Sequence, residues 1–275
     1  MNRRPVVFIT GASRGIGAAT ATAFARSGYD CALLSNEAAE LHDVAVGITS
    51  QGAAALELTG DLSDLDFAQS AVKKCFARFG RIDVLVNNAA WRDLVTMRSI
   101  ELESWEKTLR ICLTAPAFLA KWCAAQMEAT GGGVILNISS IQSRFPAGIS
   151  PAYAAAKGGL DALTYELATL YGPSRVRVLS VNPGAIDTSL SRSNTSDDLD
   201  RRMRDYVEDM IPLGRFGQPA EIANALVMLA SDSASYLTGT CIDIDGGWNH
   251  QCSPYSLKRL QFPGDYSGRQ GGPSL

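Results

Sequence analysis

Two residue types at a short spacing could perform proton chemistry on a carbonyl or alcohol. Tyr153 and Lys157 lie four residues apart, so on a helix the phenol and the ammonium share one face. A phenol ionises near pH ~10, and both an ammonium and the positive end of a helix favour its phenolate form. Ser140, at the end of a predicted strand, could donate a hydrogen bond to the same substrate oxygen. Taken alone, the Tyr–Lys spacing is more typical of an ordinary amphipathic helix.

A glycine-rich turn lies near the N-terminus, where a predicted strand passes into a predicted helix. Gly11, Gly15 and Gly17 follow the apolar run Val6–Ile9 and precede an alanine-rich stretch that favours a helix. Glycine lets the backbone turn tightly, and the first N–H groups of a helix bind phosphate. The turn therefore indicates a dinucleotide site, although a glycine turn alone is equally compatible with a structural role.

Residues at the end of the second predicted strand bear on the choice of cofactor. An acid there would bind the ribose hydroxyls of NAD and repel the extra phosphate of NADP. Ser35 and Asn36 are neutral donors, and Arg14 in the glycine turn could pair with a phosphate, which favours NADP. Glu37 keeps NAD open, since a shift of one residue would place an acid at this position. Asp61 could accept a hydrogen bond from adenine, or the stretch Asp61–Asp64 could simply cap the helix that begins at Leu65.

Composition narrows the class of protein. The chain has 275 residues, 46% hydrophobic and 19% charged, which suits one globular α/β domain. A net charge of −3 without a Lys/Arg-rich block argues against nucleic-acid binding, and no apolar segment approaches membrane-spanning length. Six cysteines without a Cys-x-x-Cys pair indicate reduced thiols, so we expect a cytoplasmic protein. His42 and His250 have no ligand-like spacing, so no metal site is expected.

Short apolar runs alternate with longer amphipathic stretches, and this alternation predicts the fold. Strands connected by helices pair in parallel through right-handed crossovers, so we expect a seven-stranded, doubly wound α/β sheet with helices on both faces. Strands are predicted at Val6–Ile9, Cys31–Leu34, Ala54–Leu58, Val84–Asn87, Val134–Ser139, Val176–Asn182 and Cys241–Asp245. Helices are predicted at Ala12–Ser27, Leu65–Phe79, Ser104–Ala129, Pro151–Tyr171 and Pro219–Ala230, with Ser150 as the N-cap of the fourth.

Two segments look separate from this core. Residues 187–217, here termed the lid segment, are polar and charged, with a helix expected near Asp198–Met210; they could form a substrate lid or a solvated insertion. Residues 1–248 should form one domain, and residues 249–275 a partly flexible C-terminal extension. Gly268–Leu275 should be frayed. Apolar residues that could pack the extension onto another surface are Tyr255, Leu257, Leu260 and Phe262.

From about Val6 to Trp248 the chain resembles the short-chain dehydrogenase/reductase family, and within it the 3-oxoacyl-carrier-protein reductases. The motifs are Thr10–Gly17, Asp61, Asn87–Ala89, Ser140, Tyr153 with Lys157, Asn182–Gly184 with Thr188, and Asp245–Gly247. The resemblance implies a single-domain Rossmann-like fold, NAD(P) and hydride transfer. It further implies Tyr153 as the acid/base, Ser140 as its helper, and Lys157 as the residue that holds the nicotinamide ribose and promotes ionisation of the tyrosine.

The resemblance also implies the cofactor contacts, with Pro183, Gly184, Ile186 and Thr188 bordering the nicotinamide. The expected cofactor-binding residues are Gly11, Ser13, Arg14, Gly15, Ile16, Gly17, Ser35, Asn36, Asp61, Leu62, Asn88, Ala89, Tyr153, Lys157, Pro183, Gly184, Ile186 and Thr188. A homotetramer with the helices of Tyr153 and of Ser104–Ala129 at its interfaces is implied as well. The substrate pocket is expected to involve Trp91–Val95, Ile141–Ile149 and the lid segment.

Two positions depart from the family pattern. Ala90 stands where the family has glycine, and we expect its methyl group to be tolerated. Cys112 stands where the family has an asparagine that helps to hold a water in a proton relay. If the relay uses the backbone carbonyl at this position, activity would survive; if it needs the side chain, turnover would fall, because a thiol bonds weakly. Cys112 could also be a small buried residue with no role in the relay.

Three functions remain open on this basis. The first is an NADP-preferring oxidoreductase acting on a small carbonyl or secondary-alcohol substrate, with 3-oxoacyl reduction as the model. A sugar or polyol dehydrogenase of the same family is the second. A nucleotide-binding protein with little catalysis is the third, motivated by Cys112 and opposed by the presence of Ser140, Tyr153 and Lys157 together.

Overall fold

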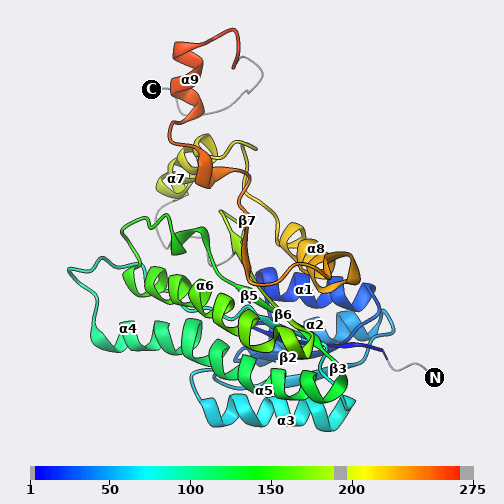
Figure 1. Cartoon of the computed structure of the whole chain (residues 1–275). Coiled ribbons are helices and arrows are strands. Elements are labelled where there is room, and N and C mark those ends of the chain that lie inside the picture. Colours follow the sequence, from blue (N-terminus) through cyan, green and yellow to red (C-terminus); the bar gives the residue numbers. More distant parts are fainter. Residues whose placement is uncertain (1–3, 189–196, 267–275) are drawn as a thin grey trace.

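The computed structural model describes residues 4–188 and 197–266. Its strands form one seven-stranded sheet in the order β3-β2-β1-β4-β5-β6-β7, with every neighbouring pair parallel (Figure 1). The chain changes direction across the sheet between β1 and β4, which is the switch point of a doubly wound fold. The predicted fold class is therefore confirmed. The strands are β1 Val6–Thr10, β2 Asp30–Ser35, β3 Ala55–Thr59, β4 Val84–Asn87, β5 Gly133–Ile138, β6 Val176–Pro183 and β7 Thr240–Ile244.

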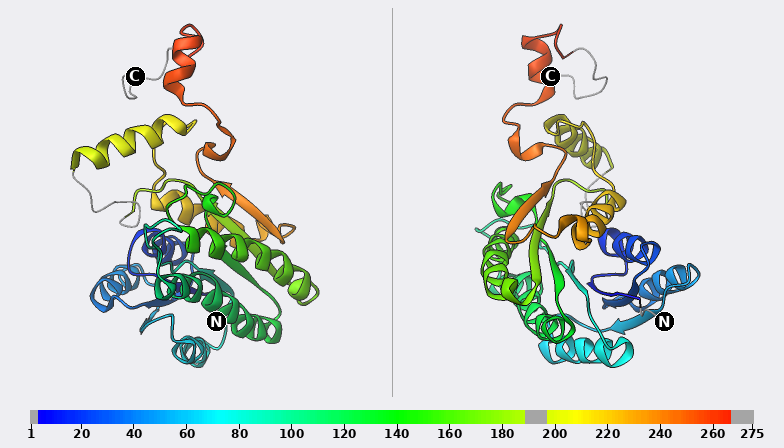
Figure 2. Two further views of the ribbon diagram at one scale, coloured as in Figure 1. Left: turned by 90° about the vertical axis from the view of Figure 1, so that its left-hand side faces the viewer. Right: turned by 45° about the vertical axis from the view of Figure 1, so that its right-hand side comes forward.

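Helices cover both faces of the sheet (Figures 1 and 2). Helices α1, α2 and α8 pack together on one face, and α3, α5 and α6 cover the other. The strands supply both layers of the core, because successive side chains point to opposite faces. In β1, Val7 and Ile9 join one apolar cluster, whereas Val6 and Phe8 join the other. The helices are α1 Gly15–Arg26, α2 Ala38–Thr49, α3 Leu65–Phe79, α4 Leu102–Leu109, α5 Ala115–Thr130, α6 Pro151–Tyr171, α7 Asp197–Met210, α8 Pro219–Ala230 and α9 Tyr255–Gln261.

The helix predicted at Ser104–Ala129 differs from the observed structure. A π-helical turn at Arg110–Thr114 separates α4 from α5, and the N–H of Ala115 donates to the carbonyl of Arg110, five residues back. Pro116 is a physical reason for the altered turn, because it has no N–H with which to continue the regular helical pattern. The spacing of the apolar residues therefore predicted a helix in this part of the chain, but it did not predict the π-helical turn.

The structure differs from the prediction at two other helices, α1 and α2. Helix α1 begins at Gly15 and not at Ala12, since the glycine turn occupies the intervening residues. Helix α2 was not singled out, although its buried residues Leu41, Ala45 and Ile48 follow helical spacing. The predicted bounds of α3, β4, α6 and α8 agree with the structure.

The lid segment and the C-terminal extension contact each other. Helix α7 occupies the predicted position in the lid segment, and α9 lies beyond it, away from the sheet (Figure 2). Asp209 of α7 is only 4% exposed, and its carboxylate accepts hydrogen bonds from the backbone N–H (3.0 Å) and the hydroxyl (2.6 Å) of Ser256. The extension is thus attached to the lid at this point. Residues 189–196 of the lid and the predicted frayed tail lie outside the described residues.

Two further features are the hydropathy of the helices and the state of the cysteines. In residues 4–188 and 197–266, no helix combines the length and apolar character needed to cross a membrane. All six cysteines are free thiols. Burial raises the pKa of the Cys31 and Cys75 thiols to about 12, so neither is a reactive thiolate at neutral pH.

Candidate active site

The predicted site residues gather at one edge of the sheet. The segments that follow β1, β2, β4, β5 and β6 all leave the sheet at this edge, because parallel neighbours run in the same direction (Figure 1). Segments far apart in the sequence therefore meet near the switch point between β1 and β4, where doubly wound folds bind ligands.

The start of α1 offers N–H groups that no side chain of the described residues caps. Arg14 is the N-cap of α1, its side chain makes no capping hydrogen bond, and the first turn contains no acidic residue. Helix α3 provides a contrast, because Asp64 accepts hydrogen bonds from the N–H groups of Asp66 and Phe67. Uncapped N–H groups at the positive end of a helix fit a diphosphate. The donors at α1 therefore suit the predicted dinucleotide.

Thr10 and Asn88 join the glycine turn to the end of β4. The Thr10 hydroxyl oxygen accepts hydrogen bonds from the N–H groups of Asn88 and Ala89, both at 3.0 Å. In return, the Asn88 amide donates to the carbonyls of Thr10 (2.9 Å) and Gly11 (3.1 Å). Gly11 has φ of 63°, and a Cβ there would lie 2.8 Å from the Ala89 Cα. The turn thus requires glycine at this position.

The end of β2 lies against the glycine turn, as the cofactor argument required. The Ser35 hydroxyl donates to the Ser13 hydroxyl at 2.9 Å and accepts from the N–H of Glu37 at 3.2 Å. Ser35 is buried, whereas Asn36 and Arg14 are exposed. Their side chains are therefore accessible to a ligand at this corner. Glu37 is the N-cap residue of α2, so its backbone position is fixed by that helix.

Asp61 and Leu62 follow β3 at the same edge of the sheet. The Asp61 carboxylate is exposed and accepts a hydrogen bond from the N–H of Ser63 at 2.8 Å. Asp64 caps α3, so the alternative interpretation of the stretch 61–64 as a helix cap is confirmed, with Asp64 as the capping residue. Leu62 is buried in the core cluster beneath. Contact of Asp61 with adenine stays a prediction.

The chain leaves β6 through a glycine in close contact with β7. Pro183 ends β6, and the N–H of Gly184 donates to the carbonyl of Ile244 at 3.1 Å. A Cβ at Gly184 would lie 2.7 Å from the Cα of Asp245. Only glycine permits this approach without a shift of the backbone.

Ile186 and Thr188 place the start of the lid segment next to two other parts of the site. Ile186 forms a parallel bridge with Gly217, the residue that ends the lid segment. A Cβ built on Gly15 would lie 3.3 Å from the Thr188 Cγ2 atom, so Thr188 lies against the glycine turn. The structure thus brings together residues that the sequence separates by more than half of the chain.

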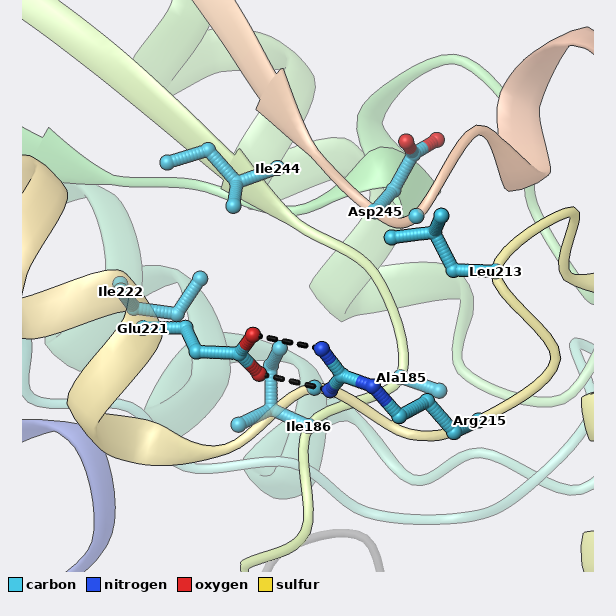
Figure 3. A pocket seen from close by; sticks show the side chains of 10 residues that line it. Ala185, Ile186, Leu213, Arg215, Glu221, Ile222, Ile244 and Asp245 are labelled. Carbon is cyan, nitrogen blue, oxygen red and sulfur yellow. Dashed lines mark hydrogen bonds and ion pairs between the residues drawn. The ribbon is translucent and has the colours of Figure 1, made fainter.

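A cavity of about 80 Å³ lies beside Ile186 (Figure 3). Arg215 and Glu221 face each other there through hydrogen bonds of 2.8 and 2.7 Å. The hydrogen bonds from Arg215 lower the pKa of Glu221 to about 2, so the pair is ionised at neutral pH. The volume suits two or three water molecules at about 30 Å³ each. Its lining is Ala185, Ile186, Leu213, Arg215, Gly217, Glu221, Ile222, Ile244, Asp245 and Gly246.

Tyr153 and Lys157 lie together in the first two turns of α6. Their side chains are 7% and 1% exposed, and the Lys157 Nζ lies 5.4 Å from the centre of the tyrosine ring. The Nζ donates to the carbonyl of Ile138 at 2.6 Å. Since Ile138 ends β5 two residues before Ser140, this bond holds the lysine next to the strand that carries the serine.

The two serines after β5 have different partners. Ser139 donates to the backbone carbonyl of Lys157 at 3.1 Å, which commits its hydroxyl to α6. The Ser140 oxygen accepts from the N–H of Gln142 at 3.1 Å, and its hydroxyl donates to no other described residue. Ser140 can therefore donate to a ligand. Ser150 is the N-cap residue of α6, but its hydroxyl donates to the Gln142 side chain at 2.9 Å and does not cap the helix.

Cys112 lies in the π-helical turn and is fully buried. Its thiol donates to the carbonyl of Trp91 at 3.4 Å and accepts from the N–H of the same residue at 3.5 Å. Its side chain also packs with Tyr153 in a small cluster. Pro116, four residues later, has no N–H to donate to the Cys112 carbonyl. The Cys112 thiol is thus hydrogen-bonded to the loop after β4. The Cys112 carbonyl cannot accept the usual helical hydrogen bond from residue 116, because that residue is proline.

Arg92 is a site residue that the sequence analysis did not identify. It lies within the predicted pocket segment Trp91–Val95, and its Cζ is 5.8 Å from the centre of the Tyr153 ring. No motif marks this arginine, since its position depends on how the loop after β4 is anchored.

The described residues contain no group of three or more His, Cys, Asp or Glu side chains that could hold a metal ion. One histidine, His42, lies on the surface, where its Nδ1 is 3.2 Å from a carboxylate oxygen of Glu57.

Comparisons with known proteins agree with this architecture. A family model described as enoyl-(acyl carrier protein) reductase matches residues 11–249. A cis-4-hydroxycyclohexanecarboxylate dehydrogenase of Sinomonas cyclohexanicum is 36% identical over 88% of this chain and 96% of its own. An L-rhamnose 1-dehydrogenase (NAD(P)(+)) of a Sphingomonas species is 34% identical over 88% and 94%. The crystal structure of L-sorbose reductase from Gluconobacter frateurii with NADPH and L-sorbose superposes with a TM-score of 0.84, at 31% identity over 90% and 97% of the two chains.

Proposed function

The chain belongs to the short-chain dehydrogenase/reductase family of oxidoreductases, and we propose that it interconverts secondary alcohols and carbonyl compounds with NADP as its preferred cofactor. The observation that carries the proposal is the contact between Tyr153 and Lys157 in α6, beside the strand that presents Ser140. Burial of an ammonium group such as that of Lys157 costs free energy unless the group has partners. Its position next to the Tyr153 phenol therefore indicates a role in the chemistry.

The three side chains divide the proton chemistry among them. In alcohol oxidation, Ser140 donates a hydrogen bond to the substrate oxygen, and the Tyr153 phenolate accepts the hydroxyl proton. Lys157 stabilises the phenolate by its charge. A bound nicotinamide would supply the acceptor for the hydride of the carbinol carbon, so that the alcohol would become a ketone and the cofactor would be reduced. In the reverse direction the Tyr153 hydroxyl returns its proton to the carbonyl oxygen.

The cofactor would lie across the edge of the sheet. We assign its diphosphate to the uncapped N–H groups of α1 and its adenosine to Ser35, Asn36, Asp61 and Asn88. Pro183, Gly184, Ile186 and Thr188 would border the nicotinamide, with Lys157 on the ribose. The close packing of Gly15 against Thr188 supports this course, because it places the proposed diphosphate site next to a residue of the proposed nicotinamide site.

Arg14 should decide the preference for NADP. We expect NADPH to bind about tenfold more tightly than NADH, because an exposed Arg–phosphate pair adds roughly 1–1.5 kcal/mol. Fluorescence titration of the reduced nicotinamide measures both affinities. In Arg14→Gln the preference should vanish while NADH binding stays unchanged. Tighter binding of NADH to the wild-type protein would instead assign the ribose contact to Glu37.

Cyclic alcohols and sugars are the substrates that we favour over 3-oxoacyl thioesters. Two relatives with at least 34% identity are named for a hydroxycyclohexane acid and for rhamnose. The 3-oxoacyl reaction, which the sequence resemblance suggested, is the second candidate. Oxidation of 4-hydroxycyclohexanecarboxylate and of L-rhamnose, compared with reduction of an acetoacetyl thioester, separates the two classes.

A nucleotide-binding protein with little catalysis is the alternative, and Cys112 tests it. We expect Cys112→Asn to change kcat by less than about tenfold, because an amide would replace two hydrogen bonds that the thiol already makes with Trp91, and one such bond contributes about 1 kcal/mol. Steady-state kinetics with Cys112→Ser as the isosteric control measure the effect. A rise in kcat of a hundredfold or more would mean that the native relay is impaired.

Assembly and compartment complete the proposal. Helices α5 and α6 expose apolar side chains, among them Phe118, Tyr165 and Leu170, which are 39%, 49% and 60% exposed. We propose that these surfaces form the interfaces of a homotetramer, since exposed apolar side chains on adjacent helices favour association. The six free thiols suit a reducing compartment such as the cytoplasm.

A further inference from the structure

Helix α7 is attached to both ends of the lid segment through one side chain. A guanidinium nitrogen of Arg204 lies 3.5 Å from a carboxylate oxygen of Asp187, where the lid segment begins. The Arg204 Cζ lies 4.3 Å from the centre of the Phe216 ring, one residue before the lid segment ends. We term Asp187, Phe216 and Gly217 the lid base. The position of α7 is thus tied to the position of the lid base.

The lid base adjoins the proposed nicotinamide site. The N–H of Asp187 donates to the Gly217 carbonyl, and the N–H of Gly217 donates to the Ala185 carbonyl, both at 2.9 Å. Ile186 lies between these two bonds, and Thr188, the next residue after Asp187, lies against the glycine turn. A movement of the lid base would therefore displace the residues proposed to border the nicotinamide.

The C-terminal end of α7 is bound to the C-terminal extension. The buried Asp209 carboxylate accepts hydrogen bonds from the N–H of Ser256 at 3.0 Å and from its hydroxyl at 2.6 Å. The Gln251 amide donates to the Asp209 carbonyl at 3.3 Å. Burial of a carboxylate costs free energy unless hydrogen bonds offset it, so these bonds specify one position of the extension against α7. Ser256 lies beyond residue 249, where the match to the family model ends.

We propose that Asp209 and Ser256 are positioning residues, whose contact acts through α7 to hold the lid base in place and thereby strengthens binding of the nicotinamide cofactor. Arg204 and Asp209 belong to the same helix, and a rigid helix can couple its two points of attachment. This inference rests on the proposed oxidoreductase function, which assigns the cofactor to this edge of the sheet. It extends that function to a segment beyond the matched domain.

Asp209→Ala tests the proposal. NADPH should bind about 3- to 30-fold more weakly, the range typical of a coupling residue away from the ligand, while kcat at saturating cofactor stays within about twofold. Fluorescence titration and steady-state kinetics measure the two quantities. Asp209→Asn should recover part of the affinity, because its amide oxygen still accepts a hydrogen bond from Ser256. Combining Ser256→Ala with Asp209→Ala should add nothing to the loss in Asp209→Ala, because both changes break the same contact.

Asp205→Ala is the matched control, because Asp205 is an exposed carboxylate on the same helix. It should bind NADPH with wild-type affinity. Ser256→Ala removes only the hydroxyl bond, so it should fold normally and show a smaller loss of affinity than Asp209→Ala. A fall in kcat as large as the loss of affinity, together with a lower unfolding midpoint, would overturn the proposal, because the contact would then be structural.

Hydrogen exchange gives a readout that does not depend on catalysis. In Asp209→Ala, peptides that contain the N–H groups of Asp187, Gly217 and Ser256 should exchange faster, whereas Asp205→Ala should match the wild-type protein. Faster exchange at Ser256 alone, with wild-type affinity for NADPH, would overturn the proposal, because the contact would then hold only the extension. If the wild-type protein did not bind NADPH, the oxidoreductase function would be wrong, and exchange at Asp187 and Gly217 would still decide whether the extension positions the lid base.

Discussion

Tyr153→Phe should lower kcat by about 10²- to 10⁴-fold in both reaction directions while leaving NADPH binding unchanged. This is the range that one positioned acid/base group contributes, and no other phenol is assigned to the site. The hydroxyl of Tyr153 makes no hydrogen bond to another described residue, and its ring packs with Cys112 and Ala156. Phenylalanine keeps that packing, so the free energy of unfolding should change by less than about 1 kcal/mol. Steady-state kinetics and urea unfolding measure the two effects.

Tyr165→Phe is a matched control on the same helix. Its hydroxyl lies 3.1 Å from the Cys241 sulfur, and this hydrogen bond raises the pKa of Tyr165 to about 12, so it is no acid/base at neutral pH. The variant should keep wild-type kcat. If Tyr153→Phe retained near-full turnover, the proposed mechanism would be wrong. If it lost turnover together with several kcal/mol of stability, the hydroxyl would be structural.

The positions of the proposed catalytic residues could be predicted from the sequence because, in this fold, the order of strands and helices determines which residues lie close together. Alternating strands and helices imply a parallel sheet, and a parallel sheet brings every strand end to one edge. Ser140 follows strand β5 and Tyr153 lies in the first turn of α6, two elements whose bounds were predicted almost correctly, so their proximity could be foreseen. The same holds for the glycine turn and Ser35, which meet through the Ser13 hydroxyl.

Contacts between loops could not be predicted in this way. The position of Arg92 depends on the bonds between Trp91 and Cys112 and between Asp93 and Ser104, which join side chains to distant backbone or side-chain groups. Hydrophobic periodicity carries no information on such pairs. It likewise does not distinguish an α-helical turn from the π-helical turn at Cys112, because one widened turn changes the helical period only locally.

Cys112, which departs from the family pattern, therefore has more than one contact that matters for the site. On the sequence alone, Cys112 is either a replacement for a relay residue or a small buried residue with no role in the relay. In the structure its thiol positions the loop that carries Arg92 and also packs against Tyr153. Substitution of this cysteine should thus affect KM as well as kcat, and the two quantities need to be measured separately in any test of the relay.

Gly17→Ala should abolish measurable binding of NADPH and, with it, all turnover. A Cβ at this position would lie 2.1 Å from the Gly11 carbonyl oxygen and 2.6 Å from the Asn88 amide nitrogen. The first turn of α1 must then move away from the glycine turn, which misaligns the N–H groups proposed to hold the diphosphate. Loss of two charge-assisted hydrogen bonds, at about 1.5–3 kcal/mol each, weakens binding by more than about 100-fold. Fluorescence titration measures the affinity.

Gly47→Ala is the control for the added methyl group. Gly47 is an exposed residue of α2, and a Cβ there would meet no atom within 4 Å. Alanine favours a helix over glycine, so this variant should be more stable by up to about 1 kcal/mol and should bind NADPH normally. Overpacking should make Gly17→Ala less stable by about 1–3 kcal/mol, a loss that urea unfolding separates from the loss of affinity. Wild-type affinity in a folded Gly17→Ala protein would place the diphosphate elsewhere, because the clash falls on the very turn assigned to it.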